Sequence, residues 1–185
     1  MIPLVHLSKP VLLLVDIGAW AVFHSATGYA VHRGPLRWFD HDTRLTRPRR
    51  CERGGRTYQR LGIRRWKDHL PEAGGLFRGG VSKQRIPAGE GGLQRLAAET
   101  RRAEWGHVLC TACSVLFVLW NPLWIAGVMV VYGVAVNAPF IAVQRYNRLR
   151  VNRALGRRAN RSTKAASSAA ARSRTDRGTT GSSIP

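Results

Sequence analysis

The chain has 185 residues, of which 44% are hydrophobic, and carries a formal charge of +20 with only 10 acidic residues. This length favours one compact unit over a multidomain protein. A pI near 11.7 is typical of nucleic-acid-binding proteins, but the hydrophobic residues gather into blocks, which favours a lipid environment over RNA.

The first apolar block runs from about residue 10 to residue 30 and is long enough for one tilted membrane-spanning helix. Only Lys9 supplies positive charge before it, and Trp20 and Phe23 lie within it, which does not fit a cleavable secretory signal. We therefore expect an uncleaved anchor. Asp16 inside this block costs roughly 2.5–3.5 kcal/mol to insert, so it should face a partner helix or a water-filled cavity.

A basic, glycine-rich segment from residue 33 to residue 107 separates this block from a second one. It has few apolar runs, so it predicts short helices with little core of their own. Residues 93 to 107 carry apolar positions at helical spacing and predict a helix that leads into the membrane. Because Lys and Arg accumulate in cytoplasmic loops, we expect this segment and the equally basic C-terminus to be cytoplasmic.

The second apolar block, residues 108 to 143, contains no charged side chain. As one helix it would be about 54 Å long, whereas a bilayer core is only about 30 Å thick. Proline breaks a helix and restricts the residue before it, so we expect the chain to turn at Asn121-Pro122 and form a membrane hairpin. The first arm, residues 108 to 120, either crosses fully or is re-entrant, and the second arm is long enough to cross.

From residue 159 to residue 185 the chain consists mainly of Ala, Ser, Thr, Arg and Gly, a composition typical of a disordered tail. The sequence thus predicts an all-α integral membrane protein, multi-pass in the cytoplasmic membrane. Residues 1 to 158 form a single unit, and the tail follows. Cys110 and Cys113 lie one turn apart without other metal ligands, so they read as packing residues, and no metal site is expected.

Polar residues with catalytic potential precede the second block. Glu104 and His107 lie one turn apart on the predicted helix, and a carboxylate beside an imidazole can fix the tautomer that a general base requires. Such a pair would suit acyl transfer to an alcohol. The alternative is that Glu99, Arg102 and Glu104 form surface ion pairs while His107 marks the membrane interface.

A second polar group follows the block. If the block folds as a hairpin, Arg145, Arg148 and Arg150 return close to His107, where guanidinium groups could bind phosphates in bidentate fashion. The alternative is an ordinary basic stop after a membrane span, with Tyr146 as an interfacial aromatic.

The strings E-T-R-R-A-E-x-x-H at 99–107 and N-A-P-F-I-x-x-Q-R-Y-N-R-x-R at 137–150 resemble the glycosyl-4,4'-diaponeurosporenoate acyltransferase family of staphyloxanthin-type carotenoid synthesis. Upstream, Trp38, Glu52, Gly55, Tyr58 and the string R-R-W-K-D-x-L-P-E at 64–72 fit the same pattern. The resemblance covers about residues 10 to 152. It implies a small membrane enzyme that esterifies the C6 hydroxyl of a glucosyl carotenoid with a fatty acyl group.

The resemblance also implies the reactants. The donor would be an acyl thioester such as acyl-CoA or acyl-carrier protein, with no resident cofactor. Membrane lipids, a lipid-soluble glycosylated acceptor and other pigment-synthesis enzymes would be the partners, and nucleic acid would not. No G-x-S-x-G motif is present, which favours direct transfer, with Cys110 or Cys113 as an acyl carrier the alternative.

The candidate catalytic residues are His107 as the base and Glu104 or Glu99 to orient it. Arg145 and Arg148 would hold the donor's phosphates or the oxyanion. The full set of candidate substrate-binding residues is Arg102, Asn137, Gln144, Arg145, Asn147, Arg148, Trp66 and Lys67. Two other functions compete: a non-enzymatic membrane scaffold or anchor, and a membrane-tethered, basic nucleic-acid-binding protein.

Overall fold

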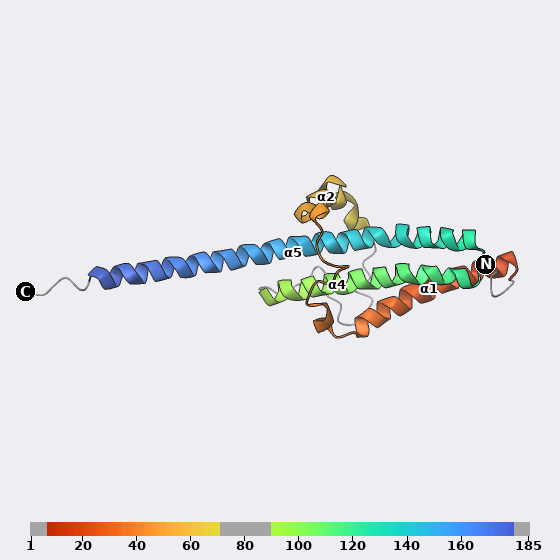
Figure 1. The fold of residues 1–185 in the computed structure, drawn as a ribbon, viewed down its shortest axis with the longest axis horizontal. Coiled ribbons are helices and arrows are strands. Elements are labelled where there is room, and N and C mark those ends of the chain that lie inside the picture. The colour runs from red at the N-terminus through yellow and green to blue at the C-terminus, as the bar shows by residue number, and fades with distance from the viewer. Residues whose placement is uncertain (1–6, 71–89, 180–185) are drawn as a thin grey trace, which may run out of the picture.

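The computed structural model describes residues 7–70 and 90–179, and every regular element in these ranges is helical, as the sequence predicts (Figure 1). Three long helices dominate: α1 (Lys9–Arg33), α4 (Glu90–Cys113) and α5 (Leu123–Thr179). The short elements are η1 (Leu36–Phe39), η2 (Arg50–Gly55), α2 (Arg56–Arg60), α3 (Ile63–Trp66), η3 (Lys67–His69) and η5 (Ser114–Leu119). The last two residues of the 64–72 string lie outside the described ranges.

Helix α1 is apolar on nearly all sides. Pro10 lies in its first turn, where a missing N–H does no harm, and the helix ends directly before Gly34 and Pro35. Most of its aliphatic side chains point outward, with Leu14 68% exposed, and Asp16 is its one buried residue. A helix that presents aliphatic side chains to its surroundings suits lipid better than water.

The chain reverses between η5 and α5. Asn121 and Pro122 lie in this reversal, where the sequence predicts a turn, and α4 and α5 then run side by side in opposite directions (Figure 1). Helix α1 packs against α4. The insertion of this helix pair into a membrane as a hairpin stays a prediction.

Helix α1, η5 and the first half of α5 pack closely together around Gly133. A Cβ atom added to Gly133 would lie 2.8 Å from the Trp20 ring and 3.1 Å from the Ser114 Cβ atom, so only glycine fits there. Trp20 also packs against Phe117 and Tyr132, each with ring centroids 5.2 Å away. A small residue at a helix crossing lets the backbones approach, as in many membrane helix pairs.

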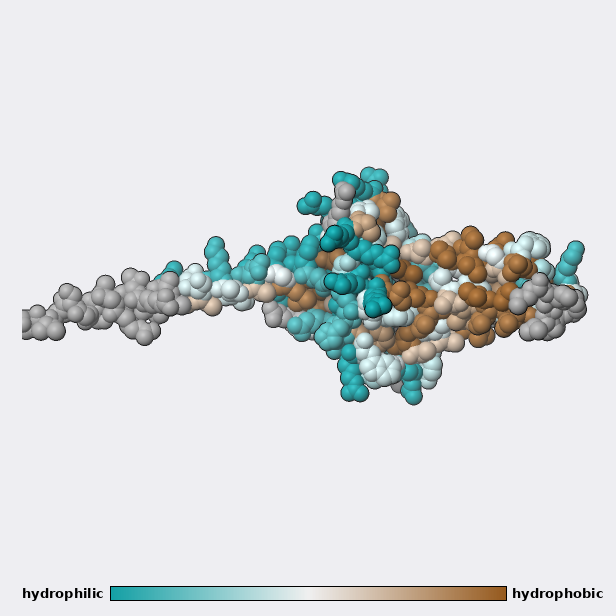
Figure 2. All heavy atoms as spheres, viewed as in Figure 1, coloured by the Kyte–Doolittle hydropathy of each residue, from teal (hydrophilic) through white to brown (hydrophobic). Residues whose placement is uncertain are grey.

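On the face shown in Figure 2, hydrophobic residues gather in one half of the described part of the molecule and hydrophilic ones in the other, and we term these the apolar half and the polar half. Helix α1 and the Leu123–Ala169 part of α5 are both long and apolar enough to cross a membrane. Their apolar side chains are largely exposed, including Trp124 at 73% and Val131 at 69%. An apolar surface of this extent marks a membrane or protein contact, which agrees with a membrane protein.

The prediction of a disordered tail is wrong for residues 159–179, because α5 continues through Thr179. Ala and Arg are among the strongest helix formers, and between Gly156 and Gly178 no glycine or proline interrupts them. Low hydrophobicity still has a consequence: the side chains of residues 156–169 are all exposed, so this part of the helix extends away from the other elements (Figure 1). Residues 180–185 lie outside the described ranges.

Asp16 ties α1 to the reversal. Its Oδ1 atom accepts hydrogen bonds from Trp120 Nε1 and from Asn121 Nδ2, both at 2.8 Å. Asp16 was expected to face a partner helix or a water-filled cavity, and it faces the reversal between η5 and α5 instead. A buried carboxylate that satisfies two buried donors fixes the start of α5 against α1.

We expect Asp16→Ala to destabilise the fold by about 1–3 kcal/mol, because Trp120 and Asn121 would keep buried donors without an acceptor. Asp16→Asn retains an acceptor oxygen of the same shape and should cost clearly less. The thermal unfolding midpoint of the detergent-solubilised protein measures both effects. Equal losses in the two variants would contradict this account of Asp16.

Candidate active site

A buried ionic network joins α4 to α5. Glu104 on α4 is 1% exposed and accepts from Arg145 Nε through Oε1 at 2.6 Å and from Arg148 Nη1 through Oε2 at 2.7 Å. Arg145 and Arg148 lie three residues apart on α5 and so share a face. Both oxygens of Glu104 are therefore engaged by charge-assisted hydrogen bonds, the strong class of such contacts.

The same two arginines bind the central segment. Arg145 Nη1 donates to Glu52 Oε1 at 2.7 Å, and its Nη2 donates to the Leu45 carbonyl oxygen. Arg148 Nη2 donates to the Thr46 carbonyl oxygen. The loop before η2 and η2 itself are thus attached to α5 through side chains, although this segment has little hydrophobic core of its own.

Glu52 is held as a carboxylate by its neighbours. Burial alone would raise its pKa, but hydrogen bonds from the Tyr58 hydroxyl and the Arg49 backbone N–H outweigh it, and Arg145 adds attraction, so the pKa lies below 4.5. The reverse holds for Tyr58, whose pKa is raised by burial and by the adjacent carboxylate. Both groups keep their usual charge near neutral pH.

The charges of the network balance. Arg101 on α4 donates through Nε to Asp42 at 2.6 Å, and Asp42 also lies 3.7 Å from Arg148 Nε. Three guanidinium groups thus face three carboxylates: Arg101, Arg145 and Arg148 face Asp42, Glu52 and Glu104. Buried charges are tolerable when they are paired in this way.

This balance bears on the predicted role of Arg145 and Arg148 in binding the donor's phosphates. Arg148 is 1% exposed, and both guanidinium groups point at protein acceptors. A phosphate could reach them only by displacing Glu104 or Glu52. The geometry therefore makes these arginines the link between α4, α5 and the central segment.

His107 pairs with an amide on the facing helix. Its Nδ1 atom lies 2.9 Å from Asn137 Oδ1, while Asn137 Nδ2 donates to the Gly133 carbonyl oxygen at 2.9 Å. Because the amide nitrogen is already committed as a donor, the oxygen faces His107 and accepts from Nδ1–H. The neutral ring then carries its lone pair on Nε2, the arrangement of a general base.

Side chains from all three long helices surround this pair and together form what we term the His107 cluster. His107 stacks on Phe140 with ring centroids 4.7 Å apart and an interplanar angle of 14°. Cys110, one turn along α4 and 1% exposed, lies 3.4 Å from His24 Nδ1 on α1. Asn137 is fully buried, so the cluster fixes both the ring plane and the tautomer of His107.

The cluster lies deeper in the apolar half than the ionic network. Along α5, Asn137 precedes Arg145 by eight residues, which is about 12 Å of helix. It precedes the last residue of the uncharged block, Val143, by about 9 Å. The imidazole therefore lies inside the apolar layer but near its polar edge.

The carboxylates that were predicted to orient His107 lie elsewhere. Glu104 shares a helix with His107 but is saturated by the two arginines. Glu99 forms an ion pair with Arg102 at 2.5 Å, one turn away on α4. The orienting group that the structure provides is Asn137, which the sequence had grouped with the substrate-binding residues.

The remaining predicted substrate-binding residues lie outside both the ionic network and the His107 cluster. Trp66 donates from Nε1 to the Leu61 carbonyl oxygen at 3.2 Å and packs against the Ile63 and Tyr146 core. Gln144 is half-buried. Lys67, which is paired with Asp68, and Asn147 line a cavity about 500 Å³ in volume beside α5.

Several residues of the network were not predicted. Arg101 lies in the 99–107 string and Glu52 is one of the upstream residues that fit the family pattern, but neither pattern indicated their partners, which are Asp42 and Arg145. Asp42 stands in an irregular stretch with no motif around it. No sequence signal placed that residue next to α4 and α5.

We expect Glu104→Gln to destabilise the fold by about 3–5 kcal/mol, because it leaves two buried guanidinium groups without their shared carboxylate. Glu99→Gln is the matched control, since it removes only a pair within one helix, worth about 0.2–0.5 kcal/mol. Chemical unfolding of both variants in detergent would compare them. Similar losses would show that the network is not the main tie between α4 and α5.

A family model described as glycosyl-4,4'-diaponeurosporenoate acyltransferase matches residues 35–157, which is more than half of the chain and includes the ionic network and the His107 cluster apart from His24. No curated protein and no solved structure matches the chain. The resemblance found in the sequence strings is thereby confirmed: the chain belongs to the glycosyl-4,4'-diaponeurosporenoate acyltransferase family and is an acyltransferase.

Proposed function

We propose that the protein esterifies a sugar hydroxyl of a glycosylated carotenoid, or of a similar glycolipid, with a fatty acyl group. The preferred position is the glucose C6 hydroxyl. The observation that carries this proposal is the His107–Asn137 pair, a histidine with a fixed tautomer inside an apolar layer. An acceptor with an apolar body and a polar head would place its hydroxyl at this depth, which lowers the entropic cost of encounter.

The chemistry that we propose is a direct transfer. His107 Nε2 removes the proton of the sugar hydroxyl while the oxygen attacks the carbonyl carbon of an acyl thioester. The new C–O bond forms, the C–S bond breaks, and the departing thiolate takes the proton back from the imidazolium. Asn137 holds Nδ1–H throughout and stabilises the imidazolium that forms between these two proton transfers.

The donor is proposed to be an acyl thioester, either acyl-CoA or acyl-carrier protein, that arrives from the aqueous side. The acceptor then comes from the lipid side, and other pigment-synthesis enzymes are candidate partners. Cys110 as a covalent acyl carrier is the alternative route. It is disfavoured because its Sγ atom is buried against His24 between helices.

We propose that α1 and the antiparallel pair of α4–η5 and α5 cross the cytoplasmic membrane together, with the central segment and the C-terminus in the cytoplasm. The uncharged part of α5, residues 123–143, is about 31 Å long, which matches the thickness of a bilayer core. Exposed Trp124 at one end of this stretch and the basic segment at the other support that orientation. The ionic network then lies at the inner surface.

Native Cys51 offers a test of this orientation, since it is exposed in the central segment. A membrane-impermeant maleimide should label it only after the cells are permeabilised, because the segment would lie in the cytoplasm. Cys51→Ser identifies the labelled thiol. Labelling of Cys51 in intact cells would refute the proposed topology.

We expect His107→Ala to lower acyl transfer by about 10²–10⁴-fold, the usual contribution of a general base. Asn137→Ala should give a smaller loss, because the base remains but its tautomer is no longer fixed. His41→Ala, an exposed histidine outside the cluster, is the control. Mass spectrometry of pigments and glycolipids from cells that express each variant measures the acyl ester against its free-hydroxyl precursor.

Unchanged ester levels in His107→Ala would remove the proposed base. Equal loss in His41→Ala would point to a general effect of histidine replacement on the fold. An identical lipid profile with and without the whole protein would instead favour the scaffold function and refute the proposed reaction.

A further inference from the structure

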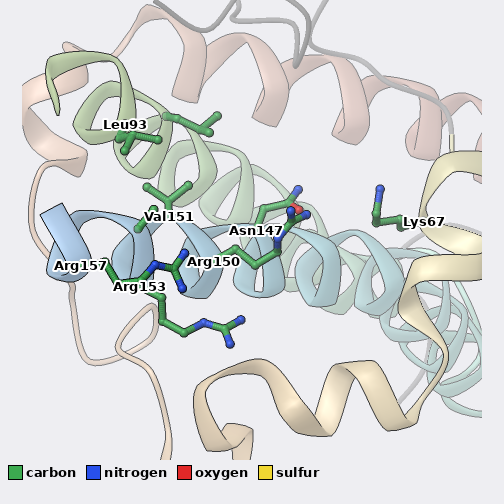
Figure 3. A pocket seen from close by; sticks show the side chains of 9 residues that line it. Lys67, Leu93, Asn147, Arg150, Val151, Arg153 and Arg157 are labelled. Carbon is green, nitrogen blue, oxygen red and sulfur yellow. The ribbon is translucent and has the colours of Figure 1, made fainter. Parts of the chain in front are cut away.

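The cavity beside α5 is formed by three separate parts of the chain. Its lining residues are Lys67, Leu93, Leu96, Asn147, Arg150, Val151, Arg153, Ala154 and Arg157. Figure 3 shows the arginines of α5 on one wall, Leu93 of α4 beside them and Lys67 on the facing segment. Its volume of about 500 Å³ lies within the range of pockets that bind small molecules and cofactors.

The arginines of this cavity differ from those of the ionic network. Among the side chains that the structure describes, no carboxylate forms an ion pair with Arg150, Arg153 or Arg157. Arg150 lies over the Tyr146 ring, 5.7 Å from its centroid, and Arg153 Nε donates to the Leu149 carbonyl oxygen. No described carboxylate thus compensates the charge of these arginines, and two of their side chains are partly held in place, an arrangement that suits a phosphate.

The distance between this cavity and the His107 cluster matches a known chemical unit. Asn147 and Arg150 follow Asn137 by 10 and 13 residues, which is about 15–20 Å along α5. An extended phosphopantetheine arm, from its phosphate to its sulfur, spans roughly the same 15–20 Å by the reach of an extended chain. The phosphate and the thioester of one donor molecule could therefore occupy the two places together.

The wall of α4 supports this path. Leu93 and Leu96 precede His107 by 14 and 11 residues, close to whole numbers of helical turns, so all three lie near one face of α4. The same face carries Glu104, which is buried against α5, so a phosphopantetheine arm that reaches from the cavity to His107 would have to run along the edge of the contact between α4 and α5. Beyond it lies the apolar half of the molecule, where the fatty acyl chain would be placed.

We propose that this cavity binds the phosphate end of a phosphopantetheine thioester and so selects the acyl donor. The site replaces Arg145 and Arg148 in that role, since their charges are already paired. This inference rests on the proposed acyl transfer for the identity of the thioester. The binding of the phosphate end can nevertheless be measured without any reaction.

The test compares two double variants of the full chain in detergent. Arg150→Gln/Arg157→Gln removes two cavity cations, whereas Arg161→Gln/Arg172→Gln removes two exposed cations further along the same helix. Calorimetry measures binding of CoA and of pantetheine, which lacks the phosphates. We expect CoA to bind the cavity variant at least about tenfold more weakly than wild type or control, because charge-assisted contacts are lost, and pantetheine to bind all three weakly.

Kinetics provide the second readout. In the cavity variant the KM for acyl-CoA should rise while kcat stays near wild type, because the cavity touches the donor's phosphates and not the reacting atoms. If acyl-carrier protein is the natural source of the same group, its KM should rise in the same variant, and its kcat/KM should exceed that of acyl-CoA. Both results support the proposal and separate the two sources.

Three outcomes would overturn it. The first is equal CoA affinity in the cavity variant and the control, and the second is an unchanged KM for acyl-CoA. The third is stronger competition with bound CoA by phosphatidylglycerol vesicles than by free CoA, which would make the cavity a lipid headgroup site. If the cavity variant transfers the acyl group as well as wild type does, the proposed function still holds and only the proposed donor site is refuted. Phosphate-dependent CoA binding without any transfer by wild type would retain the site and refute the function.

Discussion

The contact on which the rest of the structure depends is the bridge from Glu104 to Arg145 and Arg148. One buried carboxylate holds two guanidinium groups of the facing helix, so it fixes the register of α4 against α5. That register places His107, one turn beyond Glu104 on α4, opposite Asn137, which precedes Arg145 by about two turns of α5. The remaining hydrogen-bond donors of the two arginines then attach the central segment, which has too few apolar residues to pack independently.

The high net charge acquires a structural explanation from this arrangement. The buried arginines are matched one for one by carboxylates, so they contribute nothing to the excess of +20. The excess comes from exposed cations, including Arg150, Arg153 and Arg157 on α5. Paired charges tie the helices together, and the excess positive charge lies on the polar half, where it would attract the phosphates of the proposed donor and of lipid headgroups.

The sequence predicted what depends on local pattern. Long stretches without charged residues predicted the apolar helices, and Asn121-Pro122 predicted the reversal. The strings around His107 and Arg145 marked many of the polar residues that lie at the contact between α4 and α5, but not their pairing. Pairing between distant residues was beyond it: helical spacing suggested Glu104 as the partner of His107, but across the helix interface two arginines compete for that carboxylate more strongly. The prediction of disorder for residues 159–179 was wrong for a different reason. Low hydrophobicity excludes a hydrophobic core, but it does not exclude a helix rich in Ala and Arg.

The separation between the network and the His107 cluster suits a reaction between a polar donor and an apolar acceptor. Had Glu104 oriented His107 directly, a carboxylate would lie inside the apolar layer, where an unpaired charge is costly. Asn137 supplies the same fixed tautomer with a neutral amide, and its other end is satisfied by the Gly133 carbonyl oxygen of its own helix. The charged groups can therefore stay at the polar edge, while the imidazole lies at the depth that a lipid-soluble hydroxyl would reach in the proposed reaction.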